Sequence, residues 1–347
     1  MADRMTRLVV DSPSLFYRAF FAVPKSIKGP AGNSVNAVRG YLDMVSRVLA
    51  DRRPDAVANV FDADWRPQWR VDLYAGYKSK RAEDPPELPG QVPVLLEVLD
   101  AAGLPVAEAA GYEADDVIGT IAAAAGPDER LAVLTGDRDL FQVVRDPVVW
   151  VLYPLKGTSQ LATMDRAGVA AKAGVPPERY IDLAILRGDP SDGLPGVPGI
   201  GGKTAASLVD DHPDLDALLA AAAAGRLTPR LNTALTASAG YIEAMRKVVP
   251  VATDVDYRIS SPHQPDRDRL AALAAANAIE GPVERMLQAM EQAGLGPCLR
   301  TPLGAPKAAG GRAGPARAGH GRGRRRGWGR GGRSPCPAGP GRRPAPG

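Results

Sequence analysis

The sequence predicts an α/β domain with a mostly parallel central sheet flanked by helices, followed by a helical domain. Three short apolar runs, at residues 8–10, 56–61 and 131–136, each lead directly into an aspartate. Continuous apolar runs of this length are typical of parallel strands that are buried on both faces. Helical patterns lie between them, at residues 38–49 and 92–102. Strands that alternate with helices favour a parallel sheet.

The second half of the chain changes character. A further strand is predicted at residues 148–152, and a Gly- and Pro-rich stretch at 188–202 then opens into a series of helical segments. We therefore expect the α/β domain to occupy residues 1–183 and the helical domain to occupy residues 184–300.

The net charge of +4 conceals two oppositely charged parts. The last 47 residues contain ten Arg, one Lys and no acid, which leaves 32 basic and 39 acidic residues in residues 1–300. Net charge alone therefore does not indicate nucleic-acid binding. Residues 301–347 are mostly Gly, Pro, Arg and Ala, and such a tail buries too little surface to fold alone. It is either a sequence-independent nucleic-acid contact, an extension without a specific role, or an out-of-frame translation of a GC-rich gene.

Composition also restricts the cellular setting. No apolar run reaches the roughly 18 residues that a membrane-spanning helix needs, and the N-terminus lacks a charged-then-apolar leader. Cys298 and Cys336 are the only cysteines. We expect unpaired thiols in a reducing cytosol rather than a structural disulfide.

Residues 66–91 form a long connection between regular elements, and such connections are often functional. Basic side chains alternate there with aromatic ones: Arg66, Arg70, Lys78, Lys80 and Arg81 with Trp69, Tyr74 and Tyr77. This mixture suits a nucleic-acid single strand, because bases stack on rings and phosphates pair with cations. A solvated surface loop is the alternative.

Three carboxylates, Glu113, Asp115 and Asp116, lie within four residues at the start of a predicted helix. The helix dipole and the free amides favour acids there, which explains one or two of them. It does not explain why Glu113 and Asp116, three residues apart, share one face of the helix. Clustered like charges repel, so such a cluster usually needs a cation.

Other acids follow the predicted strands or occupy a turn. They are Asp11, Asp62, Asp137 and Asp139 at strand ends, and Asp189 and Asp192 in the turn at 188–193. The carboxyl ends of parallel strands meet at one edge of the sheet, so we expect these acids to converge. Asp137 and Asp139 point the same way if the chain stays extended. Strand-end turns and an Asx-type turn are the alternative interpretations.

All candidate ligands are oxygen donors, and the three histidines lie outside these motifs. Hard oxygen ligands favour Mg²⁺ or Mn²⁺ over zinc. Two such ions about 3.5–4 Å apart activate water and stabilise the leaving oxygen in phosphodiester cleavage. We therefore expect two or more Mg²⁺ per site, with Mn²⁺ as a substitute.

The glycine-rich segment at 194–204 resembles a phosphate loop, but Val197 stands where the first glycine of that pattern is required. A helix-hairpin-helix loop fits better, because its glycines and the amides of the next helix approach a DNA phosphate without reading bases. A tight turn between helices is the alternative. The expected DNA contacts are Gly196, Gly199, Gly201, Lys203 and Thr204.

The order and spacing of these motifs resemble the 5′-3′ exonuclease module at the N-terminus of bacterial DNA polymerase I, which is related to flap endonucleases. The resemblance extends over roughly residues 6–295. It rests on Val9-Val10-Asp11, Val60-Phe61-Asp62-Ala63, Gly76-Tyr77-Lys78, Gly111 to Asp116 (GYEADD), Leu134 to Leu140 (LTGDRDL) and Gly188-Asp189 through Gly201. The resemblance implies a PIN/resolvase-like sheet domain and a helix-hairpin-helix domain.

The resemblance also implies roles for matching residues. Asp11, Asp62, Glu113 and Asp115 correspond to ligands of a first metal, and Asp116, Asp137, Asp139, Asp189 and Asp192 to a second cluster. Residues 66–91 correspond to a helical arch whose Arg70, Tyr77, Lys78 and Arg81 serve the scissile phosphate. The hairpin of relatives holds K⁺, here through the backbone carbonyls of Val197 and Ile200.

Three departures from the family pattern remove no carboxylate, so activity is expected. Ser12 replaces a glycine, Arg138 a lysine and Gly193 an asparagine. Ser12 is expected to crowd the first metal slightly.

We expect a stand-alone, monomeric nuclease of the cytoplasm, associated with the nucleoid. Its substrates would be DNA with free 5′ ends, flaps or nicks, and RNA–DNA hybrids, during replication and repair alongside a DNA polymerase. Two alternatives remain. A non-catalytic DNA-junction binding protein on the same fold would lose the acids, and a PIN-like RNA nuclease would be shorter and lack the hairpin.

Overall fold

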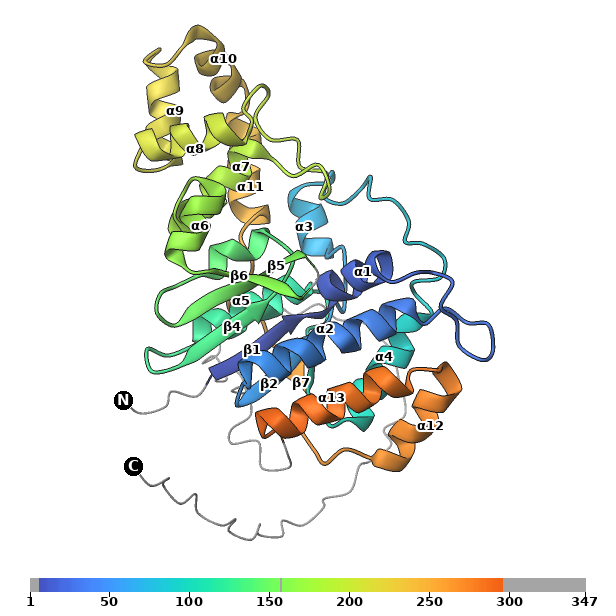
Figure 1. The fold of residues 1–347 in the computed structure, drawn as a ribbon. Coiled ribbons are helices and arrows are strands. Elements are labelled where there is room, and N and C mark those ends of the chain that lie inside the picture. The colour runs from blue at the N-terminus through green and yellow to red at the C-terminus, as the bar shows by residue number, and fades with distance from the viewer. Residues whose placement is uncertain (1–5, 157, 296–347) are drawn as a thin grey trace, which may run out of the picture. The chain divides into compact units, whose positions relative to one another are not determined.

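The computed structural model describes residues 6–156 and 158–295, which build a seven-stranded sheet with helices on both faces (Figure 1). The strand order is β6-β5-β4-β1-β2-β3-β7. The strands are β1 (Thr6–Asp11), β2 (Ala56–Val60), β3 (Val106–Glu108), β4 (Arg130–Leu134), β5 (Val149–Lys156), β6 (Gln160–Met164) and β7 (Arg258–Ile259). Neighbours from β5 to β3 pair in parallel, whereas β6 and β7 are antiparallel edge strands.

The helices alternate with the strands in the first half of the chain and dominate the second half. In chain order the α-helices are α1 (Ser12–Ala22), α2 (Asn36–Arg52), α3 (Gln68–Leu73), α4 (Gln91–Ala101), α5 (Ala114–Ala124), α6 (Arg166–Ala173), α7 (Tyr180–Arg187), α8 (Gly202–Asp211), α9 (Leu215–Ala223), α10 (Pro229–Ala237), α11 (Ala239–Val248), α12 (Arg267–Asn277) and α13 (Glu280–Ala293). Two short 3₁₀ helices, η1 (Asp139–Val143) and η2 (Pro177–Arg179), precede β5 and α7. The predicted α/β class with a C-terminal helical region is confirmed.

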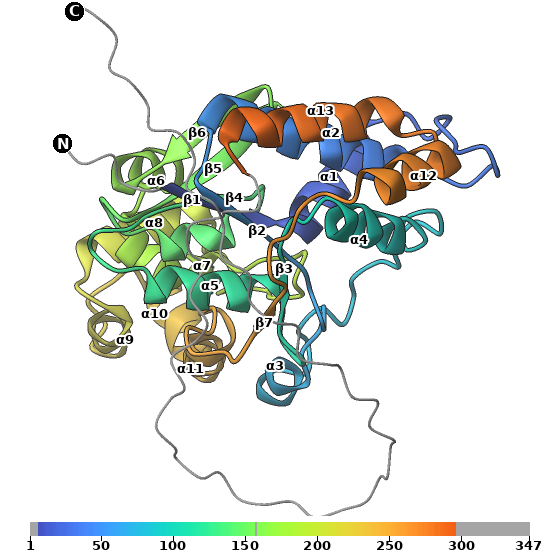
Figure 2. The ribbon, with the colours of Figure 1, turned by 90° about the horizontal axis from the view of Figure 1, so that it is seen from below.

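Strand β1 lies at the centre of the sheet, and its alternate side chains enter two separate cores. Leu8 and Val10 pack with α1, α2, α4, α12 and α13, whereas Val9 packs with α5 and α7 on the other face (Figure 2). All three side chains are almost fully buried. Successive residues of a strand point to opposite faces, so burial on both faces explains the continuous apolar run.

The helices after residue 184 occupy two places. Helices α8 to α10 lie together beyond the β6 side of the sheet, whereas α12 and α13 return to α2 and α4 (Figure 1). Arg285 of α13 pairs with Asp43 of α2 at 2.7 Å, and Met286 is buried in the shared core. The last two helices therefore pack against the helices of the sheet domain. The predicted hairpin at 188–201 lies between α7 and α8.

No helix within residues 6–156 and 158–295 is long and apolar enough to cross a membrane. The predicted basic tail at 301–347 and the two cysteines lie outside the described residues.

Candidate active site

The carboxyl ends of β1, β2 and β4 open into a cleft with a volume of about 1260 Å³. Seven of the predicted acids line it: Asp11, Asp62, Glu113, Asp115, Asp137, Asp139 and Asp189. Lys78 and Arg81 lie at the same cleft. The fold therefore brings together acids that are up to 178 positions apart in the sequence, from Asp11 to Asp189.

The acids at the ends of β1 and β2 are held by neighbouring elements. Asp11 caps α1 by accepting a hydrogen bond from the Ser14 amide at 3.2 Å, and it accepts another from the Thr135 hydroxyl at 2.5 Å. Asp62 accepts a hydrogen bond from the amide of Ala114 at 2.7 Å. Burial, together with repulsion from Asp137, raises the pKa of Asp11 to about 7 despite the bonds to Ser14 and Thr135.

Glu113 begins α5 and is surrounded by cationic and hydroxyl donors. One of its carboxylate oxygens accepts hydrogen bonds from Arg70 Nη1 at 2.5 Å and from the Tyr77 hydroxyl at 2.6 Å. The Lys78 ammonium forms an ion pair with the other oxygen. Glu113 and Asp116 form a reciprocal capping box, which accounts for their spacing without a cation. The expected cation beside this acidic cluster is thus supplied partly by the chain itself.

Asp115 and Asp139 have fewer cationic partners than Glu113. Burial and repulsion from Asp137 and Asp11 raise the pKa of Asp115 well above its usual range. Burial and the nearby Asp137 and Asp189 raise the pKa of Asp139 to about 8. One buried oxygen of Asp139 has no hydrogen-bond partner among the described residues. Proximity of like charges in a partly buried cleft disfavours ionisation, and a cation relieves it.

The donor set therefore fits a hard divalent cation, since it consists of carboxylate oxygens and includes one, on Asp139, that accepts no hydrogen bond from the described residues. Within the described parts of the chain, no three acids converge closely enough to form a preassembled cation site. The chain between Asp137 and Asp139 is also not extended as expected, because Asp139 starts a 3₁₀ helix and its amide bonds to Asp137.

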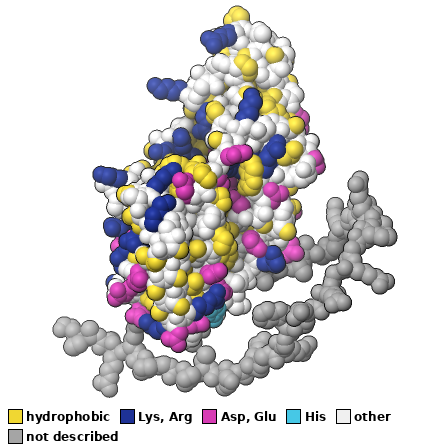
Figure 3. Space-filling view, turned by 90° about the vertical axis from the view of Figure 1, so that its right-hand side faces the viewer, with side chains coloured by type: hydrophobic (Ala, Val, Ile, Leu, Met, Phe, Trp, Pro, Cys, Tyr) yellow, Lys and Arg dark blue, Asp and Glu magenta, His cyan; other side chains and the backbone are white. Residues whose placement is uncertain are grey.

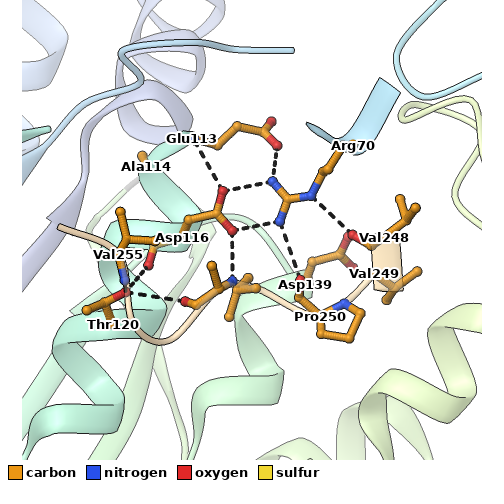
Figure 4. A network of polar contacts seen from close by, with 12 residues as sticks. Arg70, Glu113, Ala114, Asp116, Thr120, Asp139, Val248, Val249, Pro250 and Val255 are labelled. Atoms are coloured by element: carbon orange, nitrogen blue, oxygen red, sulfur yellow. Dashed lines mark hydrogen bonds and ion pairs between the residues drawn. The ribbon is translucent and has the colours of Figure 1, made fainter. Parts of the chain in front are cut away.

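The structure does not bring Arg70 and Asp116 into the cleft. Arg70 and Asp116 are 3% and 0% exposed, and the two terminal guanidinium nitrogens of Arg70, Nη1 and Nη2, donate to the two carboxylate oxygens of Asp116 (Figure 4). Asp116 also accepts the amide of Ala252 at 2.9 Å. Its two oxygens are thus already engaged by protein donors. Asp192, although not in the cleft wall, lies 3.9 Å from the Lys78 ammonium.

The expected crowding of the first metal by Ser12 is wrong. The Ser12 side chain is fully buried, and its hydroxyl lies 2.8 Å from the hydroxyl of Tyr41, which bonds in turn to Asn59. A serine at the first position of α1 therefore faces the core between α2 and β2 and bonds to Tyr41 there.

Residues 66–91 contain the short helix α3 followed by turns. Lys78 has a left-handed backbone with φ 47°, and its amide donates to the carbonyl of Asp192 at 2.8 Å. Burial alone would lower the pKa of Lys78, but the carboxylates of Glu113 and Asp192 outweigh it and raise that pKa. Arg81 lies over the half-exposed ring of Trp65 at 5.8 Å. A charged ammonium and a guanidinium thus border the acids.

The predicted hairpin is a compact loop with glycine-specific geometry. Gly188 has φ 75°, and a Cβ there would lie 2.3 Å from the amide of Gly196. The loop ends at Gly201, which precedes α8 and has open space around it. Gly199, Lys203 and Thr204 are exposed, whereas Val197 and Ile200 are buried, with the Val197 carbonyl accepting the Ile200 amide at 3.0 Å. The exposed start of α8 is therefore accessible to an anion.

Two residues of this region were not predicted from the sequence. Thr135 bonds to Asp11 and accepts the amide of Asp137, and Arg187 lies 3.9 Å from Asp139. Each directly precedes a Gly-Asp pair. This position next to a Gly-Asp pair is a sequence signal that could have identified Thr135 and Arg187. Their partners, Asp11 and Asp139, become evident only in the structure.

Residues 6–174 match the family model for the 5′-3′ exonuclease N-terminal resolvase-like domain, and residues 175–268 match the model for its C-terminal SAM fold. The chain belongs to the 5′-3′ exonuclease family. It is 48% identical over 299 residues to a 5′-3′ exonuclease of Streptomyces coelicolor, covering 81% of this chain and 98% of that protein. A 5′-3′ exonuclease of Mycobacterium tuberculosis is 43% identical and covers 83% of this chain and 98% of its own length. The chain is therefore a nuclease of this family.

Longer and more distant proteins share the fold. DNA polymerase I of Mycobacterium leprae is 39% identical and covers 83% of this chain, but only 32% of the polymerase is matched. Among solved structures, the T5 D15 protein has a TM-score of 0.55 at 17% identity, covering 83% of this chain and 99% of that one. Flap endonuclease-1 from Methanococcus jannaschii also has a TM-score of 0.55, at 16% identity, covering 82% of this chain and 92% of that one.

Proposed function

We propose that this 5′-3′ exonuclease is a metal-dependent, structure-specific nuclease that hydrolyses DNA near free 5′ ends, flaps and nicks. The observation that carries the proposal is that seven carboxylates line one cleft, which Lys78 and Arg81 border. Carboxylates alone repel a phosphodiester, whereas carboxylates that hold divalent cations attract and polarise it. The T5 D15 relative was co-crystallised with metal ions, which supports the same requirement here.

Two or more Mg²⁺, or Mn²⁺ in their place, would supply an activated water and stabilise the leaving oxygen. Asp11, Asp62, Glu113 and Asp115 would hold the first ion, and Asp137, Asp139, Asp189 and Asp192 the second. Lys78 and Arg81 would neutralise the scissile phosphate. Tyr77 orients Glu113 through its hydroxyl and does not line the cleft itself.

The hairpin would hold duplex DNA beside the cleft. The exposed amides near Gly199 and Gly201 and the side chains of Lys203 and Thr204 suit a phosphate backbone, and the carbonyls of Val197 and Ile200 suit K⁺. Figure 3 shows one face on which Lys and Arg side chains are scattered over both the upper and the lower part. A T5 D15 flap endonuclease was solved with DNA and metal ions, and GEN1 with Holliday junction DNA. Both support DNA as the substrate class.

The polymerase relatives carry a matching module within a longer chain. We therefore propose that this nuclease, acting as a monomer at the nucleoid, works with a DNA polymerase in replication and repair. RNA–DNA hybrids would be a second substrate.

The test is cleavage of a 5′-labelled DNA flap by the purified chain with Mg²⁺. We expect short 5′ products, no cleavage with EDTA and restored cleavage with excess Mg²⁺. A 3′ flap of the same sequence serves as the control and should stay intact, since only a free 5′ end meets the site. An intact 5′ flap with both Mg²⁺ and Mn²⁺ would reject the proposal.

A further inference from the structure

Three side chains, Arg70, Gln142 and Asp116, make most of the polar contacts to the backbone of residues 248–252, which lead from the end of α11 toward strand β7. Arg70 Nε donates to the carbonyl of Val248 at 3.1 Å, and its Nη2 donates to that of Pro250 at 3.4 Å. Gln142 donates to the carbonyl of Val249 (3.4 Å) and accepts the Val251 amide (2.9 Å), and Asp116 accepts the Ala252 amide (2.9 Å). The Thr120 hydroxyl also donates to the Ala252 carbonyl at 3.4 Å. Each of the five residues thus has a polar contact, several of which Figure 4 shows.

The same three side chains contact the two segments that carry cleft acids. Arg70 pairs with Glu113 at 2.5 Å and with Asp116 at 2.7 Å, and Asp116 accepts the Glu113 amide at 3.3 Å. Gln142 donates to the carbonyl of Asp139 at 2.8 Å. Residues 248–252 are therefore joined to both the start of α5 and the start of η1.

These contacts are made at close range and largely out of water. Arg70 and Asp116 are 3% and 0% exposed. A Cβ on Gly119 would lie 2.6 Å from the carbonyl of Ala252, so the segment packs directly on α5. A buried ion pair of this kind is stable only while all its donors are satisfied, and a lysine does not reproduce the planar fork of arginine.

The other end of the segment leads to the hairpin. It continues from α11, whose Tyr241 hydroxyl accepts the Gly196 amide at 3.0 Å. A continuous series of contacts therefore joins the hairpin glycine to Tyr241, α11, residues 248–252 and the acid-bearing starts of α5 and η1.

We propose that Arg70, Asp116 and Gln142 form a polar clamp on residues 248–252 that fixes the cleft acids relative to the DNA-holding hairpin. They are positioning residues, because none of them lines the cleft. Asp116 accordingly serves as the anchor of Arg70 rather than as a metal ligand. The assignment rests on the proposed nuclease function, but its main test requires neither metal nor substrate.

The test uses Gln142→Leu in the full chain, since Gln142 touches no cleft carboxylate side chain. In metal-free protein we expect hydrogen exchange at the amides of Val251 and Ala252 to accelerate at least about 10-fold, because their local opening becomes easier. The kcat for flap cleavage should fall about 10-fold, as typical for loss of a supporting contact, while the KM for the flap stays unchanged. Gln288→Leu, on the exposed face of α13, is the matched control and should change neither quantity.

Unchanged exchange at Val251 and Ala252 would overturn the clamp, whatever the activity. Faster exchange with unchanged kcat would mean that the contacts only stabilise the fold, and it would contradict a positioning role in cleavage. An inactive wild-type chain would instead reject the proposed function and leave the exchange result to decide the clamp.

Asp116 has its own readout, the number of Mn²⁺ ions bound in calorimetry. We expect Asp116→Asn to keep the wild-type number while Asp115→Asn loses an ion. Loss of an ion in a folded Asp116→Asn variant would overturn its assignment to the clamp. If Asp116→Asn does not fold, Arg70→Lys serves instead and is expected to keep the ions and lower kcat, and full activity in that variant would contradict the assignment.

Discussion

Asp137→Asn is expected to reduce flap cleavage at least about 10²-fold, because a metal ligand contributes several kcal/mol of transition-state stabilisation. Asp137 is exposed at the end of β4 and repels Asp11, Asp115 and Asp139. Its carboxylate accepts the amide of Asp139, a bond that asparagine preserves through its own oxygen. The fold and the affinity for flap DNA should therefore change little. Single-turnover cleavage and a binding titration in Ca²⁺ measure the two effects.

Asp51→Asn provides the matched control for this substitution. Asp51 is an exposed aspartate near the end of α2 and does not line the cleft. The Asp51→Asn variant should cleave the flap at the wild-type rate. A folded Asp137→Asn protein that also cleaves at the wild-type rate would remove Asp137 from the metal site, and an unfolded one would make it structural.

Lys78→Met should lower the single-turnover cleavage rate by roughly 10²–10³-fold, the usual effect of removing one pre-positioned donor from a site of developing negative charge. The side chain is 8% exposed, ion-paired with Glu113, and lies at the cleft. Methionine keeps the length and removes the charge. Glu113 retains its bonds to Arg70 and Tyr77, so the variant should stay folded.

Lys80→Met tests whether position rather than total charge matters. Lys80 is exposed in the same segment and does not line the cleft. It should retain most of the cleavage rate and lose only some affinity at low salt. Equal losses of rate in the two variants would mean that Lys78 acts as one more surface charge.

The sheet and the order of its acids were predictable because they rest on local patterns. The apolar runs before Asp11, Asp62 and Asp137 identify strands buried on both faces, and parallel topology then places their ends at one edge. β3 and β7 were not predicted, because they are three and two residues long and leave no periodic signal. The return of α13 to α2 depends on pairs such as Arg285 and Asp43, which the sequence does not connect.

The residue types of the site were predictable from the sequence, but the ion pairs and hydrogen bonds between them were less so. Arg70 and Asp116 carry the charges expected of a phosphate contact and a metal ligand, yet they neutralise each other 46 positions apart. Burial decides between these roles, and burial depends on residues 248–252, which have no distinctive motif. Ser12 shows the same limit, since its orientation toward Tyr41 follows from the start of α1 and not from its neighbour Asp11.

Anomalous scattering from crystals soaked in Mn²⁺ is the most direct test for a metal site in the cleft, because it locates the ions without relying on activity. We expect at least two peaks in the cleft, about 3.5–4 Å apart. Oxygens of Asp11 or Asp115 should contact one ion, and oxygens of Asp137 or Asp139 the other. Mn²⁺ found only outside the cleft, or a cleft without a peak at saturating Mn²⁺, would contradict a metal-dependent nuclease site.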